Sequence, residues 1–368
     1  MDIRVNLAII PDPRIERCKK HQLVDILLLC IIAMVCKVES IEDITFFGLA
    51  HIQWLKKYLA LPNGIPSPDT ILRVLARIDH KTFEECFLTW MSGYFRERVQ
   101  LGSVIAFDGK TAGGSATETE KGIHLVSAWA EQLGLVLGQV KTSEKSNEIT
   151  AIPELLAALD VSGCVVTIDA MGCQKKIARD IIQGKGDYVL ALKENHPEVY
   201  AEVTAVFPEG ALGVAEYTEI TKDHGRIEKR EAWICNDITW FEGKKDWLGL
   251  KAFGCIRSSR TVKEVTTIEY RYFLTSLTET TQFAHSVRAH WGIENKLHWT
   301  LDVALREDYA RNRKGHSAAN LAVLRKITLN LLRLEPTEKY GKQKLSLNRK
   351  RRYASYNPDF LLKILCNF

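Results

Sequence analysis

Two carboxylates that follow apolar segments are the residues of this chain with the clearest capacity for chemistry. Asp108 follows Val-Ile-Ala-Phe, and Asp169 follows Cys-Val-Val-Thr-Ile. Both runs are typical of buried strands. For either aspartate alone, a turn or capping role at a strand end is the ordinary alternative. Two of them at the ends of adjacent strands favour a metal site, because close carboxylates repel each other unless a cation lies between them.

A third acidic candidate lies in a segment with strong helical periodicity. Its polar residues recur every four positions: His290, Glu294, His298 and Asp302. An apolar stripe runs beside them: Ile293, Leu297, Leu301 and Leu305. Such a polar stripe is usually the solvent side of an amphipathic helix. Here the neighbouring tryptophans favour a partly buried polar face, and we expect Glu294 to be the third ligand from a helix packed beside the sheet.

Three carboxylates at one site suit hard divalent cations. Mg²⁺ and Mn²⁺ prefer oxygen ligands, so Asp108, Asp169 and Glu294 are predicted to be both the metal ligands and the catalytic residues. Two such ions would activate a water molecule or a 3′-hydroxyl and stabilise the leaving oxygen. The chemistry predicted is therefore phosphoryl transfer by in-line displacement.

Two rival sites use some of the same residues. His290, Glu294 and His298 have a helical spacing that could hold zinc, although the H-E-x-x-H arrangement is absent. The tripeptide Gly109-Lys110-Thr111 is similar to the end of a phosphate-binding loop. The upstream glycine of that loop is missing, so the sequence argues against nucleotide hydrolysis.

The elements around Asp108 and Asp169 follow the order strand, strand, strand, helix, strand, helix, strand. The segments expected are strands 104–108, 124–130 and 135–142, helix 147–159, strand 164–169, helix 175–183 and strand 187–192. This is the order of an α/β ribonuclease H-like fold with a mixed sheet. In that fold the first and fourth strands lie side by side and parallel, which places their ends at one edge of the sheet.

The rest of the chain divides by its periodicity. The domains expected are an N-terminal helical domain (1–98), a ribonuclease H-like catalytic domain (99–206 and 276–335), a β-rich insertion (207–275) and a basic C-terminal tail (336–368). The helical domain could bind DNA ends, mediate dimerisation or be a structural module. The tail carries a run of basic residues from Lys339 to Arg352 that is either solvated or a phosphate-contacting arm.

Composition narrows the class of protein. The net charge of +5 permits a polyanionic partner without requiring one. Nine cysteines occur without a C-x-x-C pair, which fits a reducing cytosol better than a disulfide framework. The apolar run 26–36 is shorter than the roughly 20 residues that a membrane-spanning helix needs. We therefore expect a cytoplasmic, nucleoid-associated protein with no membrane partner.

Several long motifs resemble one known family. They are Asp108-Gly-Lys-Thr, Lys145-Ser-Asn-Glu-Ile-Thr-Ala-Ile-Pro-Glu-Leu-Leu156, Thr167-Ile-Asp-Ala-Met171, Asp187-Tyr-Val-Leu-Ala-Leu-Lys-Glu-Asn195 and His290-Trp-Gly-Ile-Glu-Asn-Lys-Leu-His-Trp-Thr-Leu-Asp302. These resemble the H-repeat-associated group of DDE-type insertion-sequence transposases, over residues 12–334. The resemblance implies a ribonuclease H-like fold with an N-terminal helical domain and a β-rich insertion. It also implies a catalytic triad of Asp108, Asp169 and Glu294.

The helix that carries Glu294 departs from the wider superfamily. Where that superfamily places tyrosine, arginine and lysine, this sequence has Val287, His290 and Leu301. The resemblance therefore leaves the contact to the terminal phosphates open, with His290 or Arg288 as candidates. The residues expected to contact DNA or to support the site are Lys110, Lys193, Arg288, His290, His298 and Asp302.

The resemblance implies an enzyme that acts on double-stranded DNA. The first hypothesis is a transposase that cleaves the inverted repeats at the ends of its element and joins them to target DNA. It would use two Mg²⁺ (or Mn²⁺) ions and work as a homodimer or a larger synaptic complex. The alternatives are a DNA-nicking nuclease of the same fold without strand transfer, or a decayed DNA-binding protein. The intact triad favours catalysis over the last.

Overall fold

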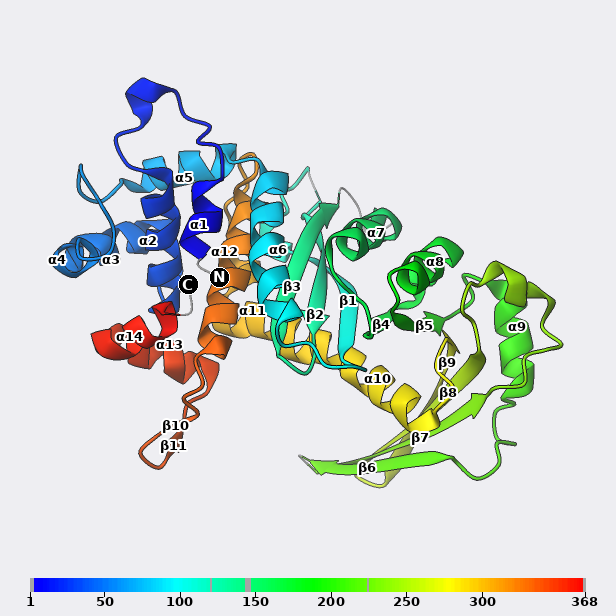
Figure 1. Ribbon diagram of the computed structural model, residues 1–368. Helices are drawn as coiled ribbons and strands as arrows, with labels where there is room; N and C mark the ends of the chain where they lie inside the picture. Colours follow the sequence, from blue (N-terminus) through cyan, green and yellow to red (C-terminus); the bar gives the residue numbers. More distant parts are fainter. Residues whose placement is uncertain (1–2, 120, 143–146, 224, 367–368) are drawn as a thin grey trace.

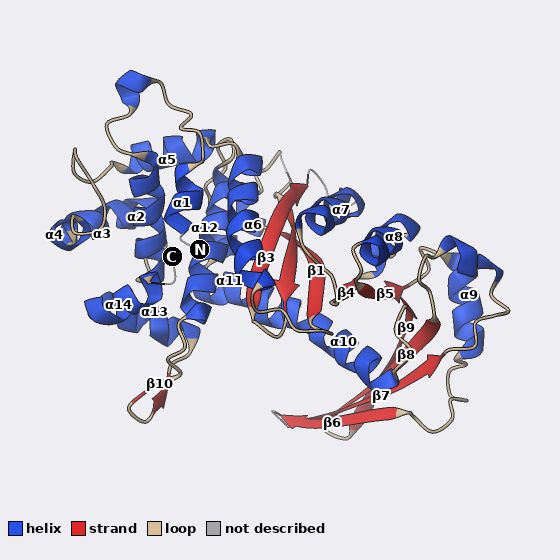
Figure 2. Cartoon of the chain, viewed as in Figure 1, coloured by secondary structure: helices blue, strands red, loops and turns tan. Residues whose placement is uncertain are grey.

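A nine-stranded sheet runs through the molecule, with a helical body at one end and a long antiparallel extension at the other (Figure 1). The computed structural model describes residues 3–119, 121–142, 147–223 and 225–366. The sequence motif at 145–156 therefore begins two residues outside the described part. Helices gather at the end that holds both termini, and strands dominate the other end (Figure 2).

The N-terminal helices form around one apolar helix. They are α1 (Ile3–Ala8), α2 (Leu23–Val35), α3 (Ile41–Ala50), α4 (Ile52–Leu55), α5 (Pro68–Arg77) and α6 (His80–Arg96). Side-chain oxygens of Ser40, Ser67 and Asp79 accept a backbone N–H three residues on, which fixes where α3, α5 and α6 begin. The apolar run at 26–36 is the buried part of α2. In the described residues, no helix has the length and hydrophobicity needed to cross a bilayer.

The first five strands confirm the predicted order. They are β1 (Val104–Thr111), β2 (His124–Ala130), β3 (Leu135–Thr142), β4 (Val165–Ile168) and β5 (Asp187–Leu192), in the spatial order β3-β2-β1-β4-β5. β1 pairs with β4 in parallel, as expected of a ribonuclease H-like fold. One boundary was wrong. β1 continues three residues beyond Asp108, because it also pairs with β2 as far as Thr111 and His124.

Helices cover both faces of these strands. Helices α7 (Glu148–Ala158) and α8 (Lys175–Gln183) connect the strands on one face. A long helical segment crosses the other face and consists of α10 (Thr280–Gly292), η6 (Ile293–His298) and α11 (Trp299–Leu305). Two adjacent residues of β1 lie against helices on opposite faces of the sheet. A Cβ at Gly109 would meet Glu148 of α7, whereas Asp108 faces His298 of η6.

The β-rich segment extends the catalytic sheet. After α9 (Pro197–Val206), the strands β6 (Tyr217–Asp223), β7 (Arg226–Cys235), β8 (Ala252–Val262) and β9 (Val265–Thr275) form an antiparallel meander. β9 pairs with β5, from Leu192↔Tyr272 to Val189↔Thr275. This pairing covers what would be an exposed edge of β5. The predicted insertion 207–275 therefore shares its sheet with the strands before it.

The helical body shares one hydrophobic core with the end of the catalytic region. Helix α12 (Ser317–Leu334) is buried along most of its length and packs against α2, α5 and α6 as well as β3. Its apolar residues join those of α2 and of α11 in a single cluster. The predicted boundary at residue 98 consequently falls within a continuous core.

The C-terminal segment was predicted to be a basic tail, and this interpretation is wrong for two of its residues. A short hairpin, β10 (Lys339–Tyr340) and β11 (Gln343–Lys344), leads into the packed helices α13 (Leu347–Tyr356) and α14 (Pro358–Leu365). Lys350 and Arg351 are buried and donate to backbone carbonyls, so they are neither solvated nor free to contact phosphate. The other basic residues of the run are exposed: Lys339, Lys342, Lys344, Arg349 and Arg352.

A buried polar chain links three elements of the body. Gln139 of β3 donates to Glu84 of α6 at 3.0 Å and accepts from Lys326 of α12 at 2.6 Å. Burial raises the pKa of Glu84 to about 7. The folded protein therefore holds the Glu84 proton more tightly than the unfolded chain does. That contribution to stability is full below about pH 4.5 and is lost as the pH rises towards 7.

We expect this titration to be visible in the free energy of unfolding. Between pH 5 and 8, wild type should lose about 2 kcal/mol relative to Glu84→Gln, which cannot ionise. Urea unfolding of both proteins across this range measures the difference. Parallel pH profiles of the two proteins would show that Glu84 does not titrate in this range.

Candidate active site

The register of β1 and β4 brings Asp108 and Asp169 together. Phe107 and Ile168 are the last residues paired across the two parallel strands, so the next residue of each strand is an aspartate at the same level. Asp169 Oδ1 accepts from the backbone N–H of Met171 at 3.1 Å, which turns the chain away from the sheet. The two carboxylates therefore lie side by side because of sheet register, as the sequence predicted.

Glu294 lies where the long helical segment changes its winding. Residues Ile293–His298 form a π-helical turn between α10 and α11. A π-helical turn holds one more residue than an α-helical turn and so rotates everything after it. The predicted polar stripe nevertheless keeps one face. His290 contacts β4 at Thr167, and His298 and Asp302 contact β1 at Asp108 and Lys110. Glu294, which is exposed, lines the cavity that also contains Asp108 and His290.

A cavity of about 790 Å³ collects the three predicted carboxylates. Asp108, Asp169 and Glu294 all line it, together with Lys193 and His290. Lys193 is exposed and follows β5, so its ammonium group is available at the rim. The cavity thus has an acidic floor and a basic residue at its edge, an arrangement that suits cations below a phosphodiester.

Burial and nearby negative charges alter the ionisation of Asp108 in this cavity. Burial raises the pKa of Asp108 to about 7, and the negative charges of Asp169 and Glu294 add to the rise. The nearest histidine does not offset this charge, because burial lowers the pKa of His298 to about 3. His298 Nδ1 lies 3.5 Å from Asp108 Oδ2, and its Nε2 has no hydrogen-bond partner among the residues that the structure describes. Carboxylate oxygens whose negative charge is not balanced by a nearby positive group suit divalent cations.

His290 lies against β4. Its Nδ1 shares a hydrogen bond of 2.9 Å with the hydroxyl of Thr167, the residue before Ile168. Burial lowers the pKa of His290 to about 4, so the ring is neutral at pH 7. Arg288, the other candidate, is exposed but lines a neighbouring groove beside β6–β9.

The zinc alternative is not favoured by the directions of its side chains, because His290 and His298 are directed to Thr167 and Asp108. Within the described residues, the group whose metal-ligand atoms all lie within 4.8 Å of one another consists of Asp79, His80 and His316. Neither the zinc set nor the three carboxylates lie that close together.

Comparison with known proteins identifies the family. Residues 99–331 match the model described as the Transposase DDE domain, and residues 5–91 match the one described as DDE_Tnp_1-associated. The chain belongs to the DDE transposase family. Its fold is ribonuclease H-like, and it is an insertion-sequence transposase, a DDE-type polynucleotidyl transferase.

Relatives align with nearly the whole transposase. The protein named "H repeat-associated putative transposase YhhI" of Escherichia coli K12 is 39% identical over 98% of this chain and 96% of its own length. YncI of Escherichia coli O157:H7 is also 39% identical, over 98% of this chain and 93% of its own. A piggyBac transposase synaptic complex with hairpin DNA aligns with a TM-score of 0.46 and 12% identity, over 98% of this chain and 78% of that one.

Lys110 of the transposase pairs with acidic residues of the protein itself. Its ammonium group lies 2.5 Å from Asp302, 3.0 Å from Glu307 and 3.2 Å from Asp308. Burial opposes the charge of Lys110, but coulombic attraction and hydrogen bonds to Glu307 and Asp302 outweigh it and raise the pKa of Lys110. Lys110 and Asp302 therefore join β1 to the end of the catalytic helix, which favours the supporting role for both.

Sequence reasoning missed a buried pair behind Asp108. His124 Nε2 and Glu148 Oε1 lie 2.6 Å apart, and His124 Nδ1 also bonds Thr111 at 2.9 Å. A Cβ at Gly109 would approach Glu148 Oε1 to 2.2 Å, so only glycine leaves room for this pair. The signal was present, since Glu148 belongs to the motif at 145–156 and Gly109 follows Asp108.

A second close approach holds the catalytic helix against the sheet. A Cβ at Gly292 would lie 1.9 Å from Glu131 Oε2, which already accepts from Trp129 Nε1 at 2.7 Å. Lys296 pairs with the other oxygen of Glu131. Glycine two residues before Glu294 therefore lets the helix lie close enough for Glu294 to reach the cavity.

Proposed function

We propose that this transposase cleaves DNA at the ends of its element and joins them to target DNA, with two divalent metal ions held by Asp108, Asp169 and Glu294. One observation carries the proposal. The three carboxylates that the family resemblance implies line one cavity, where burial and then the negative charges of Asp169 and Glu294 raise the pKa of Asp108, and a cation would relieve both effects. Mg²⁺ or Mn²⁺ bound there would activate the attacking oxygen and stabilise the leaving one.

The chain's own residues position the substrate and the ligands. Thr167 and the neutral His290 fix the wall between β4 and α10. His298 lies against Asp108 and, being neutral, adds no positive charge that would compete with a cation for this carboxylate. Lys193, which is exposed and lines the cavity, would bind a backbone phosphate. Arg271 lines the same cavity but is paired with Glu269 at 2.9 Å and lies over the Trp291 ring at 5.2 Å, so it holds the cavity wall.

The partners follow from the reaction. Both DNA ends of an element must be cut in a coordinated way, so we propose a homodimer or a larger synaptic complex on double-stranded DNA.

The test is cleavage of a DNA fragment that carries the inverted repeats flanking the element, with added Mg²⁺ and with a supercoiled plasmid as target. We expect cuts that map to the repeat ends and that disappear when EDTA replaces the metal. Joined products in the plasmid support strand transfer. Cuts without joined products would favour the nicking nuclease. Binding to the repeats without any cut would favour the decayed DNA-binding protein.

A further inference from the structure

A second groove lies between the helical body and the segment that follows the catalytic helix. It has a volume of about 920 Å³, lies between α5 and residues 311–317, and shares no lining residue with the catalytic cavity. Five cationic side chains line it: Arg73, Arg77, Arg311, Arg313 and Lys314. Asp69 is the acidic residue on its wall.

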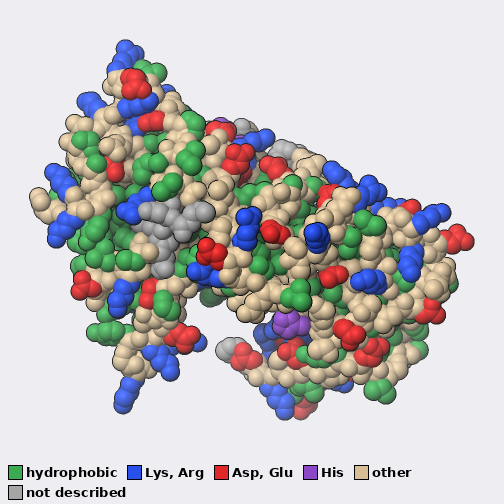
Figure 3. Space-filling model, viewed as in Figure 1, with side chains coloured by type: hydrophobic (Ala, Val, Ile, Leu, Met, Phe, Trp, Pro, Cys, Tyr) green, Lys and Arg blue, Asp and Glu red, His purple; other side chains and the backbone are tan. Residues whose placement is uncertain are grey.

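This excess of positive charge is local. The chain as a whole has 50 basic and 45 acidic residues, and the two kinds are interspersed over the face shown in Figure 3. The groove of about 440 Å³ beside β6–β9 mixes basic and acidic residues as the whole chain does, because its arginines are paired with glutamates. Examples are Arg271 with Glu269 and Arg230 with Glu228.

The five cations of the 311–317 groove are not neutralised by the protein. All five are exposed, and none forms an ion pair with a carboxylate of the described chain. Arg73 Nε donates to the carbonyl of Asp69 at 3.0 Å, and Arg313 Nε donates to the carbonyl of Gly114 at 3.2 Å. These bonds orient two guanidinium groups and leave their charge free for a polyanion.

The groove is built rigidly, although its walls are more than 200 residues apart in the sequence. Gly315 has φ of 56°, and a Cβ there would lie 2.4 Å from the carbonyl oxygen of Ala76 at the end of α5. The next amide, that of His316, donates to the same oxygen at 3.1 Å. Buried Asn320 Nδ2 donates to the carbonyls of Leu75 at 2.8 Å and Ile78 at 2.9 Å.

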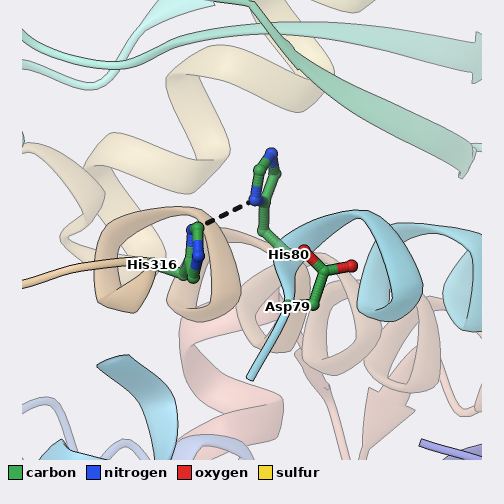
Figure 4. A group of neighbouring side chains, drawn as sticks. All are labelled: Asp79, His80 and His316. Carbon is green, nitrogen blue, oxygen red and sulfur yellow. Dashed lines mark hydrogen bonds between the residues drawn. The ribbon is translucent and has the colours of Figure 1, made fainter. Parts of the chain in front are cut away.

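A contact between two helix starts completes this junction. His80, the first residue of α6, points to His316, which immediately precedes α12, and their Nδ1 atoms lie 3.1 Å apart (Figure 4). Since Ser317 at the start of α12 lines the groove, the positive end of a helix of 18 residues adds to the charge of the side chains.

We propose that this groove binds the sugar–phosphate backbone of duplex DNA, outside the nucleotides that enter the catalytic cavity. The inference deepens the proposed function and rests on it for the identity of the polyanion. Regularly spaced phosphates are the ligand for a preformed row of unpaired arginines and lysines. Such contacts fix the position of the duplex without reading its sequence.

The test measures DNA binding without Mg²⁺, by fluorescence anisotropy of a labelled random-sequence duplex between about 50 and 200 mM salt. The groove variant combines Arg77→Gln, Arg311→Gln and Lys314→Gln, whose side chains form no hydrogen bond or ion pair with the described residues. A second variant keeps the charge with Arg77→Lys, Arg311→Lys and Lys314→Arg. The matched control removes three exposed cations elsewhere, with Lys244→Gln, Lys245→Gln and Lys251→Gln.

We expect the groove variant to bind about 10- to 100-fold more weakly and to lower the salt slope of log K by about 2 to 3. The charge-keeping variant and the control should retain the wild-type slope. Equal slopes for wild type and groove variant, or an equal loss in the control, would overturn the proposal. This assay contains no metal, so its result does not depend on cleavage. If wild type fails to cleave DNA while the groove variant still shows the lower salt slope, the proposed catalysis is rejected and the groove proposal stands.

Discussion

Replacing Asp169 with asparagine is expected to lower metal-dependent cleavage by about 10³-fold or more. The loss of one charged ligand removes several kcal/mol of stabilisation of the charge that develops on the phosphoryl oxygens, and about 1.4 kcal/mol corresponds to a factor of ten. The fold should survive, because Asp169 also accepts from the amides of Met171 and Gly172, and an asparagine oxygen can accept the same bonds.

Cleavage rates are measured with saturating Mg²⁺. DNA binding and thermal unfolding of the same preparations show whether the variant still folds and binds its substrate. The control is Asp160→Asn, an exposed aspartate in the loop before β4. We expect Asp169→Asn to bind DNA and unfold as wild type does while cleavage is lost. A variant that cleaves within a few-fold of wild type would remove Asp169 from the catalytic residues.

The largest effect on stability is expected at Arg351, far from the cavity. This side chain is fully buried and donates to the carbonyl of Met34 through Nε at 3.0 Å and Nη2 at 2.7 Å. Its Nη1 also donates to the carbonyl of Ala304 and lies 3.0 Å from Glu39. One guanidinium thus ties α13 to the ends of α2 and α11. Arg351→Ala should cost about 3–5 kcal/mol, because it leaves buried carbonyls without donors and opens a cavity.

The neighbouring arginine is a matched control for this prediction. Arg352 is exposed, so Arg352→Ala removes the same charge and should change stability by less than about 0.5 kcal/mol. Urea unfolding of the two variants and wild type measures both values. Similar stabilities for Arg351→Ala and Arg352→Ala would show that the buried contacts of Arg351 contribute little.

The sequence predicted well what depends on local pattern. The runs before Asp108 and Asp169 are apolar and β-branched, and their pairing as parallel neighbours follows from the order of the elements. The positions of both aspartates at one edge are then a consequence of register. The long motifs supplied Glu294 as well, through the family resemblance.

What could not be predicted depends on contacts between distant residues. The π-helical turn at Ile293–His298 is one such feature, since periodicity gives no sign of it. The turn lies between two contacts to the sheet. Thr167 bonds His290 before the turn, and Asp108 faces His298 within it. In the same way a basic run is indistinguishable from a solvated tail until Met34 and Ala304 are brought to Arg351 by the fold.

The central claim is that Asp108, Asp169 and Glu294 hold the metal ions of catalysis, and a change of metal preference tests it most directly. Cleavage by Asp169→Cys is measured in Mg²⁺ and in Mn²⁺ beside wild type. A thiolate is a poor ligand for Mg²⁺ and a better one for the softer Mn²⁺. We predict activity for wild type in both metals and for Asp169→Cys in Mn²⁺ alone. Cleavage by Asp169→Cys in Mg²⁺ at the wild-type rate would contradict the claim.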